Sequence, residues 1–275
     1  MAIKSILLHM APDPSRETRL NTALGLARRF EAHLHIVYMT KPIHLPAQIT
    51  GRGASSAFLA EAAEIAREKA REVEEWLRET CDAAGVSWQM EIAEGDHNEE
   101  LAAFGHYADL IIVSKDHGIT FEDYIGLHKP DELLMIATAP VLMLPKGEAS
   151  PPPVGKRILV AWKDCKEAAR AVRDSLHFLQ QAEAVFVFSA DEAHHRFEGG
   201  RKLVAYLARH GIEAEPLSDV GDHQIGDTVL SYAEDHRCDL LVMGAYGRPR
   251  WREIVWGGVT HKVLSNAKIP LLLSH

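Results

Sequence analysis

Residues 239–247 read DLLVMGAYG, a short apolar run followed by glycines at positions 244 and 247. Four consecutive apolar residues suit a central strand of a parallel sheet, which helices cover on both faces. The glycines predict a turn whose backbone can approach a ligand closely, because no Cβ stands in the way. A second glycine pair, Gly257 and Gly258, follows after nine further residues. The stretch therefore predicts an α/β domain with a ligand-binding loop at the end of a strand.

The strand in this stretch has a counterpart earlier in the chain, which indicates an internal repeat. Residues 108–113, ADLIIV, correspond to residues 238–242, CDLLV, at an offset of 130. Near the start, residues 4–8, KSILL, correspond to residues 156–160, KRILV, at an offset of 152. Because an overlooked repeat would misassign the whole architecture, this pattern decides the domain organisation.

A segment rich in proline separates the two copies. Residues 145–153 read PKGEASPPP, a composition typical of a stiff, solvated linker. The chain has 275 residues, which suits two domains of about 130 residues each. We therefore expect one domain at residues 1–147 and a second at residues 152–275.

Short apolar runs alternate with helical periodicity in both copies. Strands are expected at 3–9, 33–39, 87–92, 109–113, 140–144, 157–162, 184–189, 213–217, 239–243 and 270–273. Helices are expected at 16–30, 57–84, 97–106, 129–137, 166–181, 198–210, 223–236 and 259–266. This alternation predicts two tandem doubly wound domains, each an open five-stranded parallel sheet of order 3-2-1-4-5 with helices on both faces. Ligands of such sheets bind beyond the carboxyl ends of the first and fourth strands, here near residues 162–166 and 244–258.

The composition excludes several classes of protein. The formal net charge is −9, and no dense run of Lys and Arg is present, which argues against nucleic acid as a partner. No apolar run reaches the roughly 18–20 residues of a membrane-spanning helix, and the apolar stretch at the start is too short for a signal peptide. Three widely spaced cysteines form no C-x-x-C pair. We expect a cytoplasmic protein without a membrane partner.

The G-x-x-G-x9-G arrangement of Gly244, Gly247 and Gly257 precedes a predicted helix and a Pro-apolar strand, and it resembles the universal stress protein family. The likeness covers nearly the whole chain, in tandem. The resemblance implies a stress-response protein that binds ATP, or ADP or AMP, with or without Mg²⁺. The helix that follows the loop is consistent with this, because a helix N-terminus attracts phosphate. By this resemblance the binding residues would be Ala161, Trp162, Asp164, Ser189, Gly244, Gly247, Gly257, Gly258 and Val259.

The N-terminal copy lacks these glycines. At the offset of 130 the corresponding residues are Ser114, His117, Leu127 and His128, and acidic side chains surround them. Because carboxylates repel phosphate, we expect this domain to be structural or regulatory. A metal or small-ligand site remains an alternative, because its loop combines the residues Asp116, His117, Glu122, Asp123 and His128, with His9 expected near its mouth.

A nucleotide-free scaffold is the other alternative for the whole chain. Gly258 stands where the family usually has Ser or Thr, and Asp164 comes one residue later than the family's Asp. In this interpretation the two copies pair through their terminal strands, and the sequence does not decide whether two chains also form a homodimer. Cys165, at a predicted helix N-terminus, could be a reactive thiol or a weak helix cap. No catalytic motif is present, so we expect at most a slow ATPase.

Overall fold

The structure is a computed structural model that describes residues 2–11, 13–40, 56–115, 130–145, 154–190, 198–219, 224–247 and 258–275. The N-terminal half contains β1 (Ser5–Met10), α1 (Arg16–Phe30), β2 (His33–Thr40), α2 (Ser56–Ala84), β3 (Trp88–Glu94), α3 (His97–Gly105), β4 (Leu110–Ser114), α4 (Pro130–Ile136) and β5 (Val141–Leu144). The C-terminal half contains β6 (Arg157–Trp162), α5 (Lys166–Gln180), β7 (Ala184–Ala190), α6 (Glu198–Arg209), β8 (Glu215–Asp219), α7 (Ile225–Asp235), β9 (Leu240–Gly244), α9 (Val259–Asn266) and β10 (Leu271–Ser274). Each agrees with the sequence prediction to within two residues at either end.

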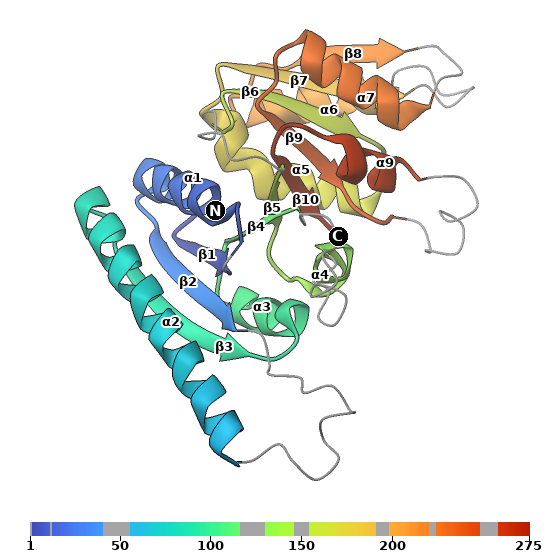
Figure 1. Cartoon of the computed structure of the whole chain (residues 1–275). Coiled ribbons are helices and arrows are strands. Elements are labelled where there is room, and N and C mark those ends of the chain that lie inside the picture. The colour runs from blue at the N-terminus through green and yellow to red at the C-terminus, as the bar shows by residue number, and fades with distance from the viewer. Residues whose placement is uncertain are drawn as a thin grey trace.

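All ten strands form one sheet, in the order β3-β2-β1-β4-β5-β10-β9-β6-β7-β8 (Figure 1). Within each half the strands are parallel and follow the predicted order 3-2-1-4-5. The halves meet where β5 pairs with β10, with Leu142 opposite Leu272. This confirms that the two copies pair with each other through their terminal strands. The exact domain boundaries at residues 147 and 152 stay a prediction.

The pairing of β5 with β10 is antiparallel. Because every other strand runs parallel to its neighbour within its own half, the strands of one half run opposite to those of the other. The strands of the two halves therefore have their carboxyl ends at opposite ends of the sheet. The segments that follow β4 and β9 thus begin at opposite ends of the sheet.

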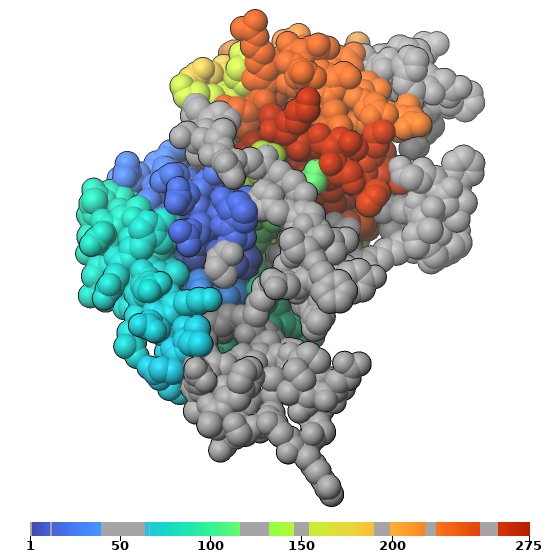
Figure 2. All heavy atoms as spheres, viewed as in Figure 1, coloured from blue at the N-terminus to red at the C-terminus, as the bar shows by residue number. Residues whose placement is uncertain are grey.

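Two apolar layers cover the sheet, and each contains residues from both halves. Successive side chains on a strand point to opposite faces. Accordingly, Leu8 and Val160 belong to the layer beneath α1, α2, α5 and α6, whereas Leu7 and Leu159 belong to the layer beneath α3, α4, α7 and α9. The two halves thus share their hydrophobic core, although they form separate regions of the surface in Figure 2.

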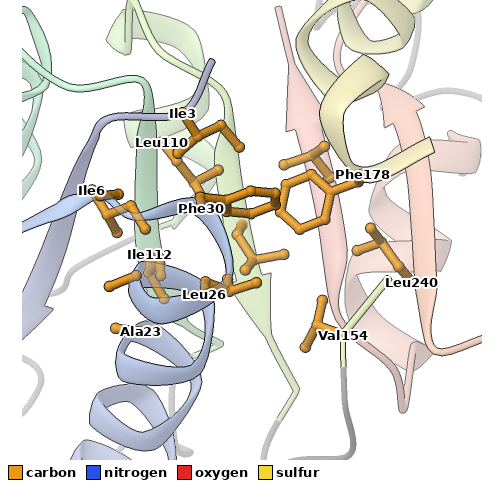
Figure 3. Close-up of a cluster of buried hydrophobic side chains, with 14 of the residues drawn as sticks. Ile3, Ile6, Ala23, Leu26, Phe30, Leu110, Ile112, Val154, Phe178 and Leu240 are labelled. Atoms are coloured by element: carbon orange, nitrogen blue, oxygen red, sulfur yellow. The ribbon is translucent and has the colours of Figure 1, made fainter. Parts of the chain in front are cut away.

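Helices α1 and α5 provide the side-chain contact between the halves. Phe30 and Phe178 meet edge to face with ring centroids 5.1 Å apart (Figure 3). Arg29 lies over both rings and donates to the Val154 carbonyl at 2.8 Å and to the Gln181 side chain at 2.6 Å. The aromatic pair is buried, so it joins the halves through packing as well as through the sheet.

The long helix α2 packs one face on the sheet where its side chains are described. Ala70, Leu77 and Cys81 are buried against the sheet, and Arg78 and Glu74 form an ion pair with an N–O distance of 2.9 Å. Among the described residues, no helix has both the length and the apolar character needed to cross a membrane.

Phe178→Ala should lower the free energy of unfolding by about 3–5 kcal/mol, because it leaves a cavity in the shared core. Urea unfolding, followed by fluorescence and circular dichroism, should show one transition for wild type and variant. Tyr107→Ala is the control, because this ring is 84% exposed. Two separate transitions, one of them unaffected by the substitution, would show that the halves unfold independently.

Candidate functional site

The carboxyl ends of β6 and β9 lie side by side in the C-terminal half, as the predicted strand order requires. Ala161 pairs with Met243, the residue before Gly244, and Trp162 pairs with Ser189 at the end of β7. Four of the predicted site residues, Ala161, Trp162, Ser189 and Gly244, are therefore brought to one edge of the sheet. This edge is the switch point at which doubly wound sheets bind ligands.

The remaining predicted residues are placed less uniformly. Asp164 is exposed in the turn after β6, and Gly247 ends the described part of the loop after β9. Gly258 is the N-cap of α9, and Val259 is the first residue of that helix. Gly257 lies outside the described residues. The structure therefore describes only the two ends of the predicted loop.

Gly244 is required by close packing. A Cβ at this position would lie 2.4 Å from the Ala168 amide nitrogen and 2.6 Å from the Glu167 carbonyl carbon. Gly244 is absent from the described glycines with positive φ, so the constraint is space rather than backbone conformation. The glycine thus lets the first turn of α5 lie directly on the end of β9.

Gly247 faces a buried carboxylate that the sequence analysis did not single out. A Cβ on Gly247 would lie 2.8 Å from Glu167 Oε2, yet Glu167 is only 3% exposed. An acidic residue in a first helical turn was a visible signal, because it favours the helix N-terminus. Its position against the glycine loop depends on how α5 packs, which sequence periodicity does not report.

Hydrogen bonds hold the Glu167 carboxylate in its ionised form. Burial alone would raise its pKa, but hydrogen bonds from its own amide, from the Cys165 thiol and from Lys166 outweigh burial and lower the pKa. The Lys166 Nζ atom lies 3.3 Å from Glu167 Oε1. Glu167 is therefore an anion at neutral pH, beside the loop that was predicted to hold phosphate.

Cys165 occupies the N-cap position of α5 in an extended conformation. Burial and the neighbouring Glu167 carboxylate raise the pKa of its thiol, despite opposing hydrogen bonds from backbone amides. Reactive cysteines require a lowered pKa. The raised pKa disfavours the thiolate and argues against the interpretation of Cys165 as a reactive thiol.

The first turn of α6 covers the ends of β6 and β7. A Cβ on Gly199 would lie 3.3 Å from Trp162 Nε1, and a Cβ on Gly200 would lie 3.2 Å from Ser189 Cβ. The indole nitrogen of Trp162 is buried and has no hydrogen-bond partner among the described residues. It is a donor that an acceptor on a ligand would satisfy.

The loop after β9 turns sharply between its two glycines. Tyr246 is buried and has a φ of 54°, a left-handed conformation that costs a non-glycine residue about 1–2 kcal/mol. The Ala245 amide donates to the Ser274 carbonyl at 2.8 Å, and His275 Nδ1 lies 2.9 Å from the Ala245 carbonyl oxygen. These contacts fix the start of the loop to β10.

The corresponding edge of the N-terminal half is arranged differently. Ser114 takes the place of Gly244 and is buried. Asp13 accepts two hydrogen bonds from Arg19, at 3.0 and 2.5 Å, and Arg19 also donates to the His9 carbonyl at 2.9 Å. Because Arg19 is only 2% exposed, this ion pair fills the end of β1 with the protein's own charges.

The histidine and acidic loop of the N-terminal half, with Asp116, His117, Glu122, Asp123 and His128, lies outside the described residues. His9 is buried, with its ring centroid 5.5 Å from that of His97. Within the described ranges, no group of three His, Cys, Asp or Glu side chains could hold a metal ion.

Comparison with known proteins identifies relatives of the C-terminal half and of the fold. The sequence model of the universal stress protein family matches residues 155–275. Over 66 residues the chain is 44% identical to universal stress protein Slr1230 from Synechocystis, a match that covers 24% of this chain and 22% of that protein. A crystal structure of a universal stress protein from Archaeoglobus fulgidus matches with a TM-score of 0.78 and 16% identity, and it covers 98% of this chain and 95% of that one.

Some shorter relatives have been solved with adenine nucleotides. One universal stress protein was crystallised in complex with cAMP, and one from Archaeoglobus fulgidus in complex with dAMP. They are 19% and 20% identical, cover 44% and 42% of this chain, and have TM-scores of 0.36 and 0.35. They place no binding residue on this chain.

Arg19→Ala should lower the free energy of unfolding by about 2–4 kcal/mol, because it leaves the Asp13 carboxylate without its partner. The upper end of the range for buried pairs is not reached, since Asp13 is 29% exposed. Chemical denaturation measures the loss. Arg16→Ala removes an exposed arginine from the same helix and should cost under about 1 kcal/mol. Equal losses in the two variants would contradict a structural ion pair.

Glu167→Gln should lower stability at neutral pH, by about 1–2 kcal/mol, through weaker hydrogen bonds to a neutral group. A group with a lowered pKa stabilises the fold above its unfolded pKa and loses this contribution as the pH falls through its folded pKa. The difference from wild type should therefore shrink below about pH 4. Unfolding at pH 7 and pH 3.5 measures it, with exposed Glu17→Gln as control. A stability difference between wild type and Glu167→Gln that does not change with pH would contradict an ionised, stabilising Glu167 carboxylate.

Proposed function

Because its C-terminal half belongs to the universal stress protein family and is joined to a second domain of the same fold, we propose that this protein binds an adenine nucleotide at the C-terminal half. The observation that carries the proposal is the meeting of Gly244, at the end of β9, with the end of β6 at the switch point. The proposed ligand is ATP, or ADP or AMP, with or without Mg²⁺.

Backbone amides are the proposed phosphate ligands. Gly258, the N-cap of α9, has no side chain that could bond to the first-turn amides of this eight-residue helix, and these amides would bind the anion instead. Gly244, Gly247 and Gly257 would add backbone positions without a Cβ. The dipole of α9 favours negative charge at the same point.

The nucleoside would lie at the ends of β6 and β7. Ala161 and Ser189 supply backbone groups there, and Asp164 is exposed beside them. The buried indole N–H of Trp162 would gain an acceptor from the ligand. We propose binding rather than turnover, with at most slow hydrolysis of ATP.

The N-terminal half is proposed to be structural or regulatory. The Arg19–Asp13 ion pair and the buried Ser114 take up the positions at its switch point. Its strand β4 ends at the opposite end of the sheet from the carboxyl end of β9. Any influence of one site on the other must therefore pass through the shared core.

A nucleotide-free scaffold is the second candidate function. One observation favours it: Gly244 already has a packing reason in the first turn of α5, and Gly247 has one in Glu167. In that case the loop would be a turn that stabilises α5, and the full chain would bind no nucleotide.

Gly247→Val should weaken ATP binding by about tenfold or more, because its Cβ would lie 2.8 Å from Glu167 Oε2 and would displace the backbone that is proposed to hold the phosphates. Titration calorimetry on the full chain, with ATP and MgCl₂, should give one nucleotide per wild-type chain. Mass spectrometry of any small molecule released on denaturation identifies the natural nucleotide.

The matched control is Gly25→Ala, because nothing lies within 4 Å of a Cβ at that position in α1. Its affinity should equal that of wild type. Gly247→Ala brings the same Cβ against Glu167 Oε2 but lacks the two methyl groups of valine. Thermal stability measured on both variants distinguishes weakened binding from a damaged fold. Two nucleotides per chain would contradict the role of the N-terminal half, and no binding would favour the scaffold.

A further inference from the structure

The Glu167 carboxylate lies beside the backbone proposed to hold the phosphates. Its Oε2 atom lies 2.8 Å from the place of a Gly247 Cβ, and its Oε1 atom pairs with Lys166. Oε2 is therefore the oxygen next to the loop. The side chain is 3% exposed, so it cannot swing into solvent without rearrangement of the first turn of α5.

This fixed anion opposes free phosphate. Two like charges repel more strongly in a partly buried site than in water, because the effective dielectric constant is lower. Lys166 compensates weakly, since its side chain is 84% exposed and screened by solvent. The N-terminus of α9 supplies about half a positive charge, less than the full negative charge of Glu167.

A divalent cation would reverse the sign of this interaction. Mg²⁺ is commonly bound by one or two carboxylates together with the phosphates of a nucleotide. Among the described residues no cluster of three ligating side chains could hold the ion alone, so it would have to arrive with the phosphates. Glu167 Oε2 is an oxygen ligand of the required type.

We infer that Glu167 is a specificity-determining residue, which makes phosphate binding at Gly244 and Gly247 depend on a divalent cation. The inference rests on the proposed function. The C-terminal half would then select metal-complexed ATP over free ATP. The uncharged nucleoside, which carries no phosphate, would bind equally with and without the cation.

Calorimetric titration of the full chain tests this dependence with ATP and EDTA, with ATP and MgCl₂, and with adenosine. Magnesium should strengthen ATP binding to wild type by about tenfold or more. In Glu167→Gln, free ATP should bind about tenfold tighter than to wild type, so that the effect of magnesium falls below about threefold. Glu167→Asp keeps the charge and should keep the magnesium dependence.

Asp174→Asn is the matched control, because it removes a carboxylate about 10 Å further along α5. It should leave the magnesium dependence as in wild type. The inference is overturned if Glu167→Gln keeps the wild-type magnesium dependence, or if wild type binds free and magnesium-bound ATP equally. It is also overturned if removal of magnesium weakens adenosine binding as much as ATP binding. Failure of both wild type and Glu167→Gln to bind any of these ligands would overturn the proposed function, and this inference with it.

Discussion

The antiparallel pairing of β5 with β10 is the constraint on which the rest of the structure depends. It turns two five-stranded sheets into one and places Leu142 beside Leu272, both fully buried. Each half thereby loses an exposed edge strand, which would otherwise be open to pairing with another chain. Because the pairing is antiparallel, it also places the carboxyl ends of β4 and β9 at opposite ends of the sheet. One set of backbone hydrogen bonds thus determines both the shared core and the separation of the sites.

The two halves use one backbone plan with different chemistry at the switch point. In the N-terminal half, Arg19 and Asp13 neutralise each other at the end of β1. In the C-terminal half, Glu167 remains an anion and lies against Gly247. A saturated ion pair suits a structural element, because no charge is left for a ligand. Under the proposed function, an anion at this position suits a ligand that brings its own cation.

The overall charge sharpens this contrast. With a formal net charge of −9, the long-range field of the protein does not attract a nucleotide. Under the proposed function, attraction would have to come from local groups, namely the amides at Gly258 and Val259 and the dipole of α9. Such groups act over one helical turn. The affinity of the site would therefore depend on the detailed placement of α5 and α9.

The amino-acid sequence by itself determined the elements, the repeat and the strand order, because apolar periodicity and glycine positions are local properties of the chain. Runs such as residues 240–243 become buried central strands wherever helices can cover them. It also located the loop at Gly244 and Gly247. Only the tertiary structure decided that Glu167 lies against Gly247 and that Arg19 engages Asp13. These contacts depend on the packing of α5 and α1 onto the sheet, and the sequence pattern reports a residue's face but not its neighbours across space.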